Sequence, residues 1–575
     1  MKIQPRRAHG QSLAPVFRLA PLLLLLLWPQ AHAGVAAVAS PEQHGTETAV
    51  AVLNAGGNAV DAAVATAFVL AVTYPEAGNI GGGGFATLTR GNEARFLDFR
   101  ESAPQTASRD MYLDANGKVI PDSSLVGHRA AGIPGTVAGL FELHKKYGSK
   151  PWKSLLQPAI KLARDGYTPP QHLVTRTTEK TRGIAGRTNF ARYFGALSTE
   201  RVFVQPELAR TLERIAARGP EGFYRGETAR LISAEMRRGG GLITEADLRG
   251  YRAIWREPLR TSWRNYEIVT APPPSSGGVA LVQLLRMKDA LKPRFEGLTH
   301  NSGQYVHLVA EMEKRVFADR AEYLGDPDFV KVPVARLIEP QYVAKRASEV
   351  DPSGISTLDH VRPGLPESLE TTHFSIVDGA GDAVAITYTL NGSFGNAVVV
   401  EGAGFLLNNE MDDFSIKPGE PNYYGVIGGG ANEIAPGKRM LSSMTPTILL
   451  QDGKVRMVLG SPGGSTIFTT VFQGIVNVED FGMSAAQAVA AARFHHQLLP
   501  PRRITYSRCC SLPDSALVEL RSRGYEPVRN PWEFGDLQMI RIDANGKAEA
   551  ASDPRGRGAS QVITLTAPVA KPAKR

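Results

Sequence analysis

The stretch Thr371-Thr-His-Phe-Ser-Ile-Val377, followed by Asp378-Gly-Ala-Gly-Asp382 and Ala383-Val-Ala-Ile-Thr-Tyr-Thr389, marks a sharp change in the character of the chain. Both outer segments are rich in β-branched and aromatic residues, and the Gly/Asp cluster between them is typical of a turn. We therefore expect a β-hairpin that opens at Thr371. The preceding segment, 355–370, is polar and contains two prolines, so it should be exposed or mobile.

A polar linker that ends at a threonine is what an N-terminal-nucleophile amidase requires. A threonine hydroxyl is a poor nucleophile unless a base lies beside it. When threonine is the first residue of a chain, its own α-amine, with an ordinary pKa of about 8, can act as that base. Such an enzyme must be made as a precursor and cut before the threonine. Taken alone the pattern is weak, since threonine often begins a strand.

Working outward from the hairpin, the chain mixes helical and β-rich segments without an internal repeat. Short β-rich runs predict further strands at 85–89, 94–99, 447–450 and 455–459. Apolar and Ala-rich periodicity predicts helices over 46–72 with a break at 54–58, over most of 130–350, and at 466–478 and 485–492.

The N-terminus has the three parts of a secretory signal peptide. Four basic residues precede a leucine run at 22–27, and Ala31-His-Ala33 supplies a small-x-small cleavage site before Gly34. The alternative is a membrane anchor, but the apolar segment 19–28 is only ten residues long, whereas a spanning helix needs roughly 20. Because no later stretch is long and apolar enough to span a bilayer, we expect an exported, soluble mature protein.

Composition excludes several other classes of protein. The 575-residue chain carries a formal charge of +9, and removing the signal with its four basic residues leaves about +5, which does not indicate nucleic-acid binding. Cys509 and Cys510 are the only cysteines, so no cysteine set exists for a zinc site. Adjacent cysteines are a poor structural staple, and we expect the pair to be incidental.

Several strings occur in the order and spacing of one known family. Together they resemble the γ-glutamyltransferase family (glutathione hydrolases) over about residues 35–563. Each string alone is weak, but all of them in register are very specific. The strings are Thr371-Thr-His-Phe-Ser with Thr387-Tyr-Thr-Leu-Asn391, Leu407-Asn-Asn-Glu-Met-Asp-Asp-Phe414, Leu441-Ser-Ser-Met-Thr-Pro446, Gly460-Ser-Pro-Gly-Gly-Ser465 and Asp98-Phe-Arg-Glu-Ser-Ala-Pro104.

The resemblance implies an α+β fold, the αββα sandwich of N-terminal-nucleophile hydrolases, autoprocessed into two subunits. The signal peptide would be 1–33, the large subunit 34–370 and the small subunit 371–575, which remain together as a heterodimer. Thr371 would attack the Glu370 carbonyl, and hydrolysis of the resulting ester would release the threonine amine.

The implied reaction is γ-glutamyl acyl transfer without a cofactor or metal. Thr371 takes the γ-glutamyl group of glutathione or another γ-glutamyl compound, and water or an amino-acid or peptide acceptor then receives it. Resemblance to bacterial members places the protein in the periplasm or, alternatively, outside the cell.

The resemblance also implies roles for individual residues at matching positions. Thr371 would be the nucleophile for both self-cleavage and catalysis, and Thr389 would hydrogen-bond its hydroxyl or amine. Gly463 and Gly464 would supply backbone N–H groups to the oxyanion, where one donor typically lowers the barrier by about 3 kcal/mol. From the residues alone, Thr389 is also an ordinary strand residue, and the glycines also suit a tight turn.

Seven further residues would hold the γ-glutamyl group. A guanidinium can bind the α-carboxylate bidentately, hydroxyls add donors there, and carboxylates and an amide can surround the α-ammonium. These residues are Arg100, Ser442 and Ser443 for the carboxylate, Asn391, Glu410 and Asp413 for the ammonium, and Tyr424 in a Gly/Pro-rich lid. The alternative is a structural ion pair of Arg100 with Asp98 or Glu101, and a solvated acidic turn at 410–413.

Two rival functions remain open at this point. A related enzyme could act on another acyl group, such as a glutaryl β-lactam, which lacks the α-ammonium; the presence of Asn391, Glu410 and Asp413 disfavours it. A non-catalytic binding protein with a decayed site is the other rival, and the intact nucleophile and oxyanion positions disfavour that.

Overall fold

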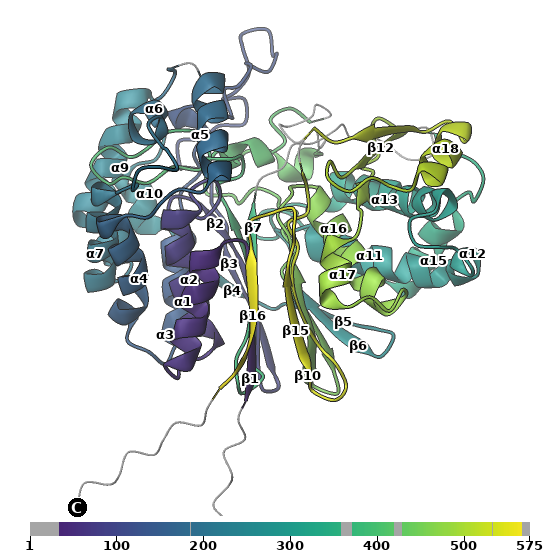
Figure 1. The fold of residues 1–575 in the computed structure, drawn as a ribbon. Coiled ribbons are helices and arrows are strands. Elements are labelled where there is room, and N and C mark those ends of the chain that lie inside the picture. Colours follow the sequence, from purple (N-terminus) through teal and green to yellow (C-terminus); the bar gives the residue numbers. More distant parts are fainter. Residues whose placement is uncertain (1–33, 185, 358–370, 419–427, 532, 566–575) are drawn as a thin grey trace, which may run out of the picture.

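The computed structural model describes residues 34–184, 186–357, 371–418, 428–531 and 533–565. Two sheets pack face to face, and helices cover the outer face of each (Figure 1). This arrangement confirms the predicted αββα sandwich. The expected signal peptide, nearly all of the predicted linker, Glu370 and Tyr424 lie outside the described residues.

The first sheet contains the predicted hairpin at its centre. All its neighbouring strands are antiparallel, and α1 (Gln43–Asn54) and α2 (Ala59–Thr73) lie against it, with every residue of α2 buried. In spatial order the strands are β16 (Ala559–Thr564), β1 (Val35–Ser40), β7 (Thr372–Val377), β8 (Ala383–Thr389), β2 (Gly83–Arg90), β3 (Glu93–Phe99) and β4 (Ile254–Arg256).

The second sheet is also antiparallel, and its outer face packs against α11 (Gly277–Ala290), α16 (Thr466–Glu479) and α17 (Ala485–Ala490). Its strands are β15 (Ala548–Ser552), β14 (Gln538–Ile542), β10 (Lys454–Gly460), β9 (Thr447–Gln451), β6 (Tyr266–Thr270) and β5 (Leu259–Trp263). Strands β4 to β6 interrupt the region 130–350, which was expected to be mainly helical. Tertiary pairing with β3 and β9 stabilises these short segments, whose own pattern is weak.

The remaining helices surround these layers. On the side of the first sheet they are α3 (Thr136–Tyr147), α4 (Trp152–Asp165), α5 (Gln171–Ile184), α6 (Phe190–Phe194), α7 (Pro206–Arg218), α8 (Glu221–Tyr224), α9 (Gly226–Gly239) and α10 (Glu245–Gly250). On the other side are α12 (Lys292–Phe295), α13 (Gly303–Tyr323), α14 (Val334–Leu337), α15 (Pro340–Ser348) and α18 (Asp514–Ser522). A small sheet joins β11 (Phe494–His495), β12 (Arg503–Tyr506) and β13 (Glu526–Arg529).

Strand register brings four chain segments to one end of the first sheet. Strand β7 starts, β8 ends, β2 starts and β3 ends there, as the pairs Thr372–Tyr388, Gly83–Thr389 and Gly84–Phe99 show. The paired residues Val35 and Thr564 mark the opposite end. Thr371, Thr389 and Arg100 therefore occupy the same edge of the sandwich.

Close packing of the two sheets brings the second sheet to that edge. A Cβ added to Gly460, the last residue of β10, would come within 2.4 Å of the His373 ring on β7. Only glycine lets the strands approach so closely, and the loop that follows Gly460 consequently lies beside Thr371.

Two further observations concern the predictions on cysteines and membranes. Cys509 and Cys510, expected to be incidental, form a disulfide between sequence neighbours. Because it closes no loop, the disulfide adds no constraint between distant segments. In the parts of the chain that the structure describes, no helix is both long enough and apolar enough to cross a membrane.

Candidate active site

Thr371 lies immediately before β7 and is 5% exposed. Continuing the β7–β8 register past the Thr372–Tyr388 pair places it opposite Thr389. The Thr389 hydroxyl accepts a hydrogen bond from the backbone N–H of Asn391 at 2.7 Å. The two predicted catalytic threonines are thus neighbours at the end of one hairpin.

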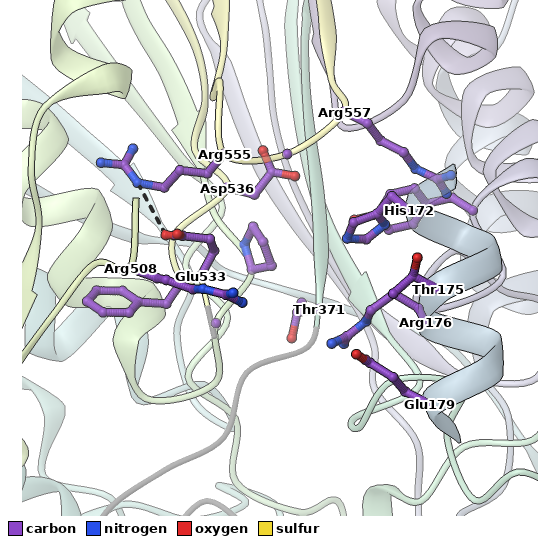
Figure 2. A pocket seen from close by; sticks show the side chains of 16 residues that line it. His172, Thr175, Arg176, Glu179, Thr371, Arg508, Glu533, Asp536, Arg555 and Arg557 are labelled. Carbon is purple, nitrogen blue, oxygen red and sulfur yellow. Dashed lines mark ion pairs between the residues drawn. The ribbon is translucent and has the colours of Figure 1, made fainter. Parts of the chain in front are cut away.

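A cavity of about 290 Å³ opens beside Thr371, and Gly463 lines it as well (Figure 2). Gly463 and Gly464 have φ values of 131° and 51°, in the region that favours glycine. Their carbonyl oxygens accept hydrogen bonds from Thr466 and Ile467 in the first turn of α16. This loop places backbone of the predicted oxyanion site next to the threonine, at the positive end of a helix dipole.

Arg100 follows β3 and is 1% exposed. Its guanidinium forms ion pairs with Glu410 and, at 2.5 Å, with Asp413, and it also donates to the Leu441 carbonyl at 3.2 Å. The structure therefore brings together three segments that are distant in sequence, at 100, 410–413 and 441. These are the segments that were predicted to bind the two charged groups of a γ-glutamyl moiety.

The alternative for these residues was a structural ion pair of Arg100 with Asp98 or Glu101 and a solvated acidic turn at 410–413. It fits the structure only in part. Asp98 bonds to Arg256 and Arg439, at 2.8 Å each, rather than to the guanidinium of Arg100, while Glu101 lies 3.7 Å from that guanidinium. The 410–413 turn is not solvated, since Glu410 is 1% exposed. Asp412 is buried too and accepts a hydrogen bond from the Ser124 hydroxyl at 2.6 Å.

Three carboxylates surround one guanidinium in this cluster. Burial raises the pKa of Glu410, of Asp413 and of Glu101, the last to about 8, although Arg100 opposes the shift in each. Burial alone would lower the pKa of Arg100, but the three carboxylates outweigh it and raise that pKa. Both carboxylate oxygens of Glu101 and one of Glu410 are buried without a hydrogen-bond donor among the described residues. The cluster is therefore short of positive charge and suited to an additional cation.

Asn391 adopts a positive φ of 74° just beyond β8, and its amide nitrogen donates to the Asn409 carbonyl at 3.0 Å. The amide oxygen is consequently the atom that can accept from a ligand ammonium. The Ser442 N–H donates to the Pro274 carbonyl, and the Ser443 hydroxyl lies 3.4 Å from a guanidinium nitrogen of Arg320. Both serines are buried beside the Leu441 carbonyl that Arg100 contacts.

Comparison with known proteins identifies the family. The family model described as gamma-glutamyltranspeptidase matches residues 45–563. The chain belongs to the γ-glutamyltranspeptidase family. The glutathione hydrolase proenzyme of Pseudomonas aeruginosa is 56% identical over 528 residues, which cover 92% of this chain and 94% of that protein.

Two solved structures share the fold of this chain. The γ-glutamyltranspeptidase from Pseudomonas nitroreducens, complexed with L-DON, is 54% identical, with a TM-score of 0.56 over 56% of this chain and 97% of that chain. The cephalosporin acylase from Bacillus halodurans is 25% identical, with a TM-score of 0.80 over 93% of this chain and 97% of that chain. These similarities confirm the family, the fold and the class of enzyme that the sequence predicted.

In this member of the γ-glutamyltranspeptidase family, sequence reasoning missed some residues at the site. Glu101 was weighed only as a structural partner, although its position next to Arg100 was a usable signal. The charged wall of the Thr371 cavity was missed entirely, since its residues come from distant segments without a local pattern (Figure 2). They are His172, Arg176, Glu179, Arg508, Glu533, Asp536, Arg555 and Arg557. No group of three or more His, Cys, Asp and Glu side chains suited to a metal ion occurs within the described ranges.

Proposed function

We propose that this protein is an exported proenzyme that cleaves itself between Glu370 and Thr371 and then hydrolyses glutathione and other γ-glutamyl amides. The same site transfers the γ-glutamyl group to amino acids or peptides. The observation that carries this proposal is the cluster of three carboxyl groups and one guanidinium at the edge of the sandwich where Thr371 lies just before β7.

Self-cleavage frees the α-amine that activates the nucleophile. The Thr371 hydroxyl attacks the Glu370 carbonyl carbon, the peptide C–N bond breaks as the threonine nitrogen takes the proton, and an ester links the two residues. Hydrolysis of that ester leaves a large chain, 34–370, bound to a small chain, 371–575. The liberated α-amine can then take the proton of the Thr371 hydroxyl as it attacks a γ-glutamyl amide. Thr389 orients that hydroxyl or amine from the adjacent strand, in a position the β7–β8 register supports.

Acyl transfer proceeds in two steps. In the first, the Thr371 oxygen bonds to the γ-carbonyl carbon, the C–N bond breaks, and the leaving amine takes the proton. In the second, water or an acceptor amine attacks the ester and restores the threonine. The N–H groups of Gly463 and Gly464 stabilise the oxyanion of both steps, each by about 3 kcal/mol.

Donor recognition depends on exchanging ion pairs within the cluster. A γ-glutamyl group brings one α-carboxylate and one α-ammonium. The carboxylate replaces an acidic side chain on Arg100, with Ser442 and Ser443 as further donors. The ammonium is held by Glu410, Asp413 and the amide oxygen of Asn391. The ion pairs of Arg100 with Glu410 and Asp413 support this assignment, because they hold acidic side chains beside the guanidinium.

A related acylase activity is the second candidate, because a cephalosporin acylase shares the fold over 93% of this chain. A glutaryl group carries the carboxylate but no ammonium. It would supply no cation to the acidic side chains of Glu410 and Asp413, which favours the γ-glutamyl donor.

The remaining parts of the proposal rest on the sequence. The signal at 1–33 supports export, with the periplasm as the location, and the Gly/Pro-rich loop with Tyr424 supports a lid over Asn391.

A denaturing gel and a chromogenic γ-glutamyl anilide test the proposal together. Two bands and release of aniline, both lost in Thr371→Ala, are the expected result. Two bands with turnover of only glutaryl amides would favour the acylase, and one uncut band without turnover would favour a binding protein.

A further inference from the structure

The loop that carries Gly463 and Gly464 depends on its neighbours for a fixed conformation. Both glycines have positive φ values, and glycine restricts the backbone less than any other residue. The direction of their N–H groups must therefore be fixed by the residues on either side. Ser465 follows directly and is the N-cap of α16. The contacts of this serine decide how firmly the loop is held.

The Ser465 side chain ties the loop to a neighbouring strand. Among the described residues, it makes no capping bond to the first turn of α16, which is the usual role of an N-cap serine. Its hydroxyl instead donates to the side-chain oxygen of Gln497 at 2.9 Å and lies 3.3 Å from Nε2 of His495, which ends β11. All three side chains are buried, so bulk water does not compete for these bonds.

The His495 ring is itself held in place. Its Nε2 lies 3.1 Å from the Gln497 oxygen, and its Nδ1 lies 3.0 Å from the Thr469 hydroxyl on α16. Because an amide oxygen only accepts hydrogen bonds, Nε2 carries the proton, which leaves Nδ1 as an acceptor facing the threonine. Phe317 of α13 packs edge to face against the ring, with the centroids 5.5 Å apart. Burial lowers the pKa of His495 to about 4, so the ring is neutral at neutral pH.

Strand β11 is also attached to the helix that the loop begins. Gln473 on α16 bonds to both backbone groups of Phe494: its amide nitrogen donates to the carbonyl at 2.8 Å, and its amide oxygen accepts from the N–H at 3.3 Å. Helix, strand and loop therefore form one closed set of hydrogen bonds. The link through Ser465 is the part of that set nearest to the two glycines.

We propose that His495 and Gln497 are positioning residues for the oxyanion site. Through Ser465 they fix the backbone of Gly463 and Gly464, so that the N–H groups are oriented before negative charge develops on the donor carbonyl. This proposal rests on the function proposed above, which assigns those N–H groups to the oxyanion. Removing one oxyanion donor typically lowers kcat by about 10²–10³-fold, so misaligning the loop should cost about 10–100-fold.

Two substitutions separate the ring nitrogens of His495. The side-chain amide of glutamine reaches the position of Nε2, whereas that of asparagine reaches only the position of Nδ1. His495→Asn should therefore lose the link to Ser465 and lower kcat for a γ-glutamyl anilide by about 10–100-fold, while KM changes less than about twofold. His495→Gln should keep kcat within about threefold of wild type. Gln497→Met, which removes the accepting oxygen, is a second variant that should behave like His495→Asn.

The neighbouring His496 provides a matched control for general damage to the fold. It is equally buried, but its ring bonds to the backbone N–H of Leu498 at 2.9 Å and to the Pro501 carbonyl at 3.1 Å. His496→Asn should lower the thermal midpoint about as much as His495→Asn, yet leave kcat within about twofold of wild type.

Inhibitor binding gives the second readout. A boronic acid analogue of glutamate becomes tetrahedral when the Thr371 oxygen adds to boron, and so imitates the oxyanion, whereas L-glutamate imitates only the ground state. In His495→Asn the inhibition constant of the boronic acid should rise by the factor by which kcat/KM falls, and that of L-glutamate should not move.

Equal weakening of both inhibitors, or a loss of kcat in His496→Asn as large as in His495→Asn, would overturn the positioning role. If the wild-type protein neither cleaves itself nor hydrolyses the anilide, the proposed function fails. If it does both, and His495→Asn and Gln497→Met retain kcat, only the positioning role fails.

Discussion

Replacing Asp413 by asparagine removes one negative charge from the donor cluster while keeping the shape of the side chain. Asp413 pairs with Arg100 at 2.5 Å, and its side chain is 14% exposed, so its electrostatic interactions are little screened by water. The variant should lose affinity for the α-ammonium of the donor but keep Arg100 available for the α-carboxylate. Its effect should therefore depend on whether the donor carries an ammonium.

The size of the effect follows from the burial of the cluster. A hydrogen bond to a charged group contributes about 1.5–3 kcal/mol, and truncating one member of a buried charge pair costs about 2–5 kcal/mol. Taking about 3 kcal/mol, kcat/KM for a γ-glutamyl anilide should fall on the order of 10²-fold. A glutaryl anilide, which has the carboxylate but no ammonium, should change less than about threefold, since it makes no contact that the variant removes.

The neighbouring Asp412 provides a matched control on the same turn. It is buried but accepts a hydrogen bond from Ser124, so Asp412→Asn should not discriminate between the two donors. Steady-state kinetics with both anilides on the three proteins gives the ratio directly. If Asp413→Asn lowers turnover of both donors equally, or if Asp412→Asn is as selective, the assignment of the ammonium site is wrong.

Two further predictions concern protonation and packing. Burial raises the pKa of Glu101 to about 8, so this carboxyl carries a proton below that pH and ionises as the pH rises. Inhibition by L-glutamate should therefore strengthen between about pH 6 and pH 8, by at most about tenfold per pH unit. Glu101→Gln should remove this pH dependence, whereas inhibition by glutarate should show no such pH dependence in either protein. Gly460→Ala would push a Cβ against the His373 ring and should destabilise the fold by about 1–3 kcal/mol, measured as a lower thermal midpoint, whereas Gly183→Ala, in open space on α5, should leave stability unchanged or slightly higher.

Local sequence patterns were sufficient to predict much of the fold. The hairpin of β7 and β8, the pair β2 and β3, and the break between α1 and α2 have strong periodicity and clear turn residues, and all of them form as expected. Strands β4 to β6 were missed because they are three to five residues long and half-exposed, and pairing with distant strands stabilises them. Propensity alone does not reveal such elements.

The candidate site could also be predicted only in part from local sequence patterns. Arg100, Glu410 and Asp413 could be proposed from motifs, yet their direct ion pairing depends on the sheet register that brings segments over 300 residues apart to one edge. The cavity wall was not predictable, because Arg176 and Arg508 come from a helix and a loop that meet only in the folded sandwich.

The most direct test of the account is the covalent state of the active protein. Intact-mass measurement and N-terminal sequencing of the purified enzyme, combined with turnover of a γ-glutamyl anilide, locate any break in the backbone. We expect two chains, the smaller beginning at Thr371, and a single inactive chain for Thr371→Ala. Full activity in a protein whose bond between Glu370 and Thr371 is intact would contradict the account.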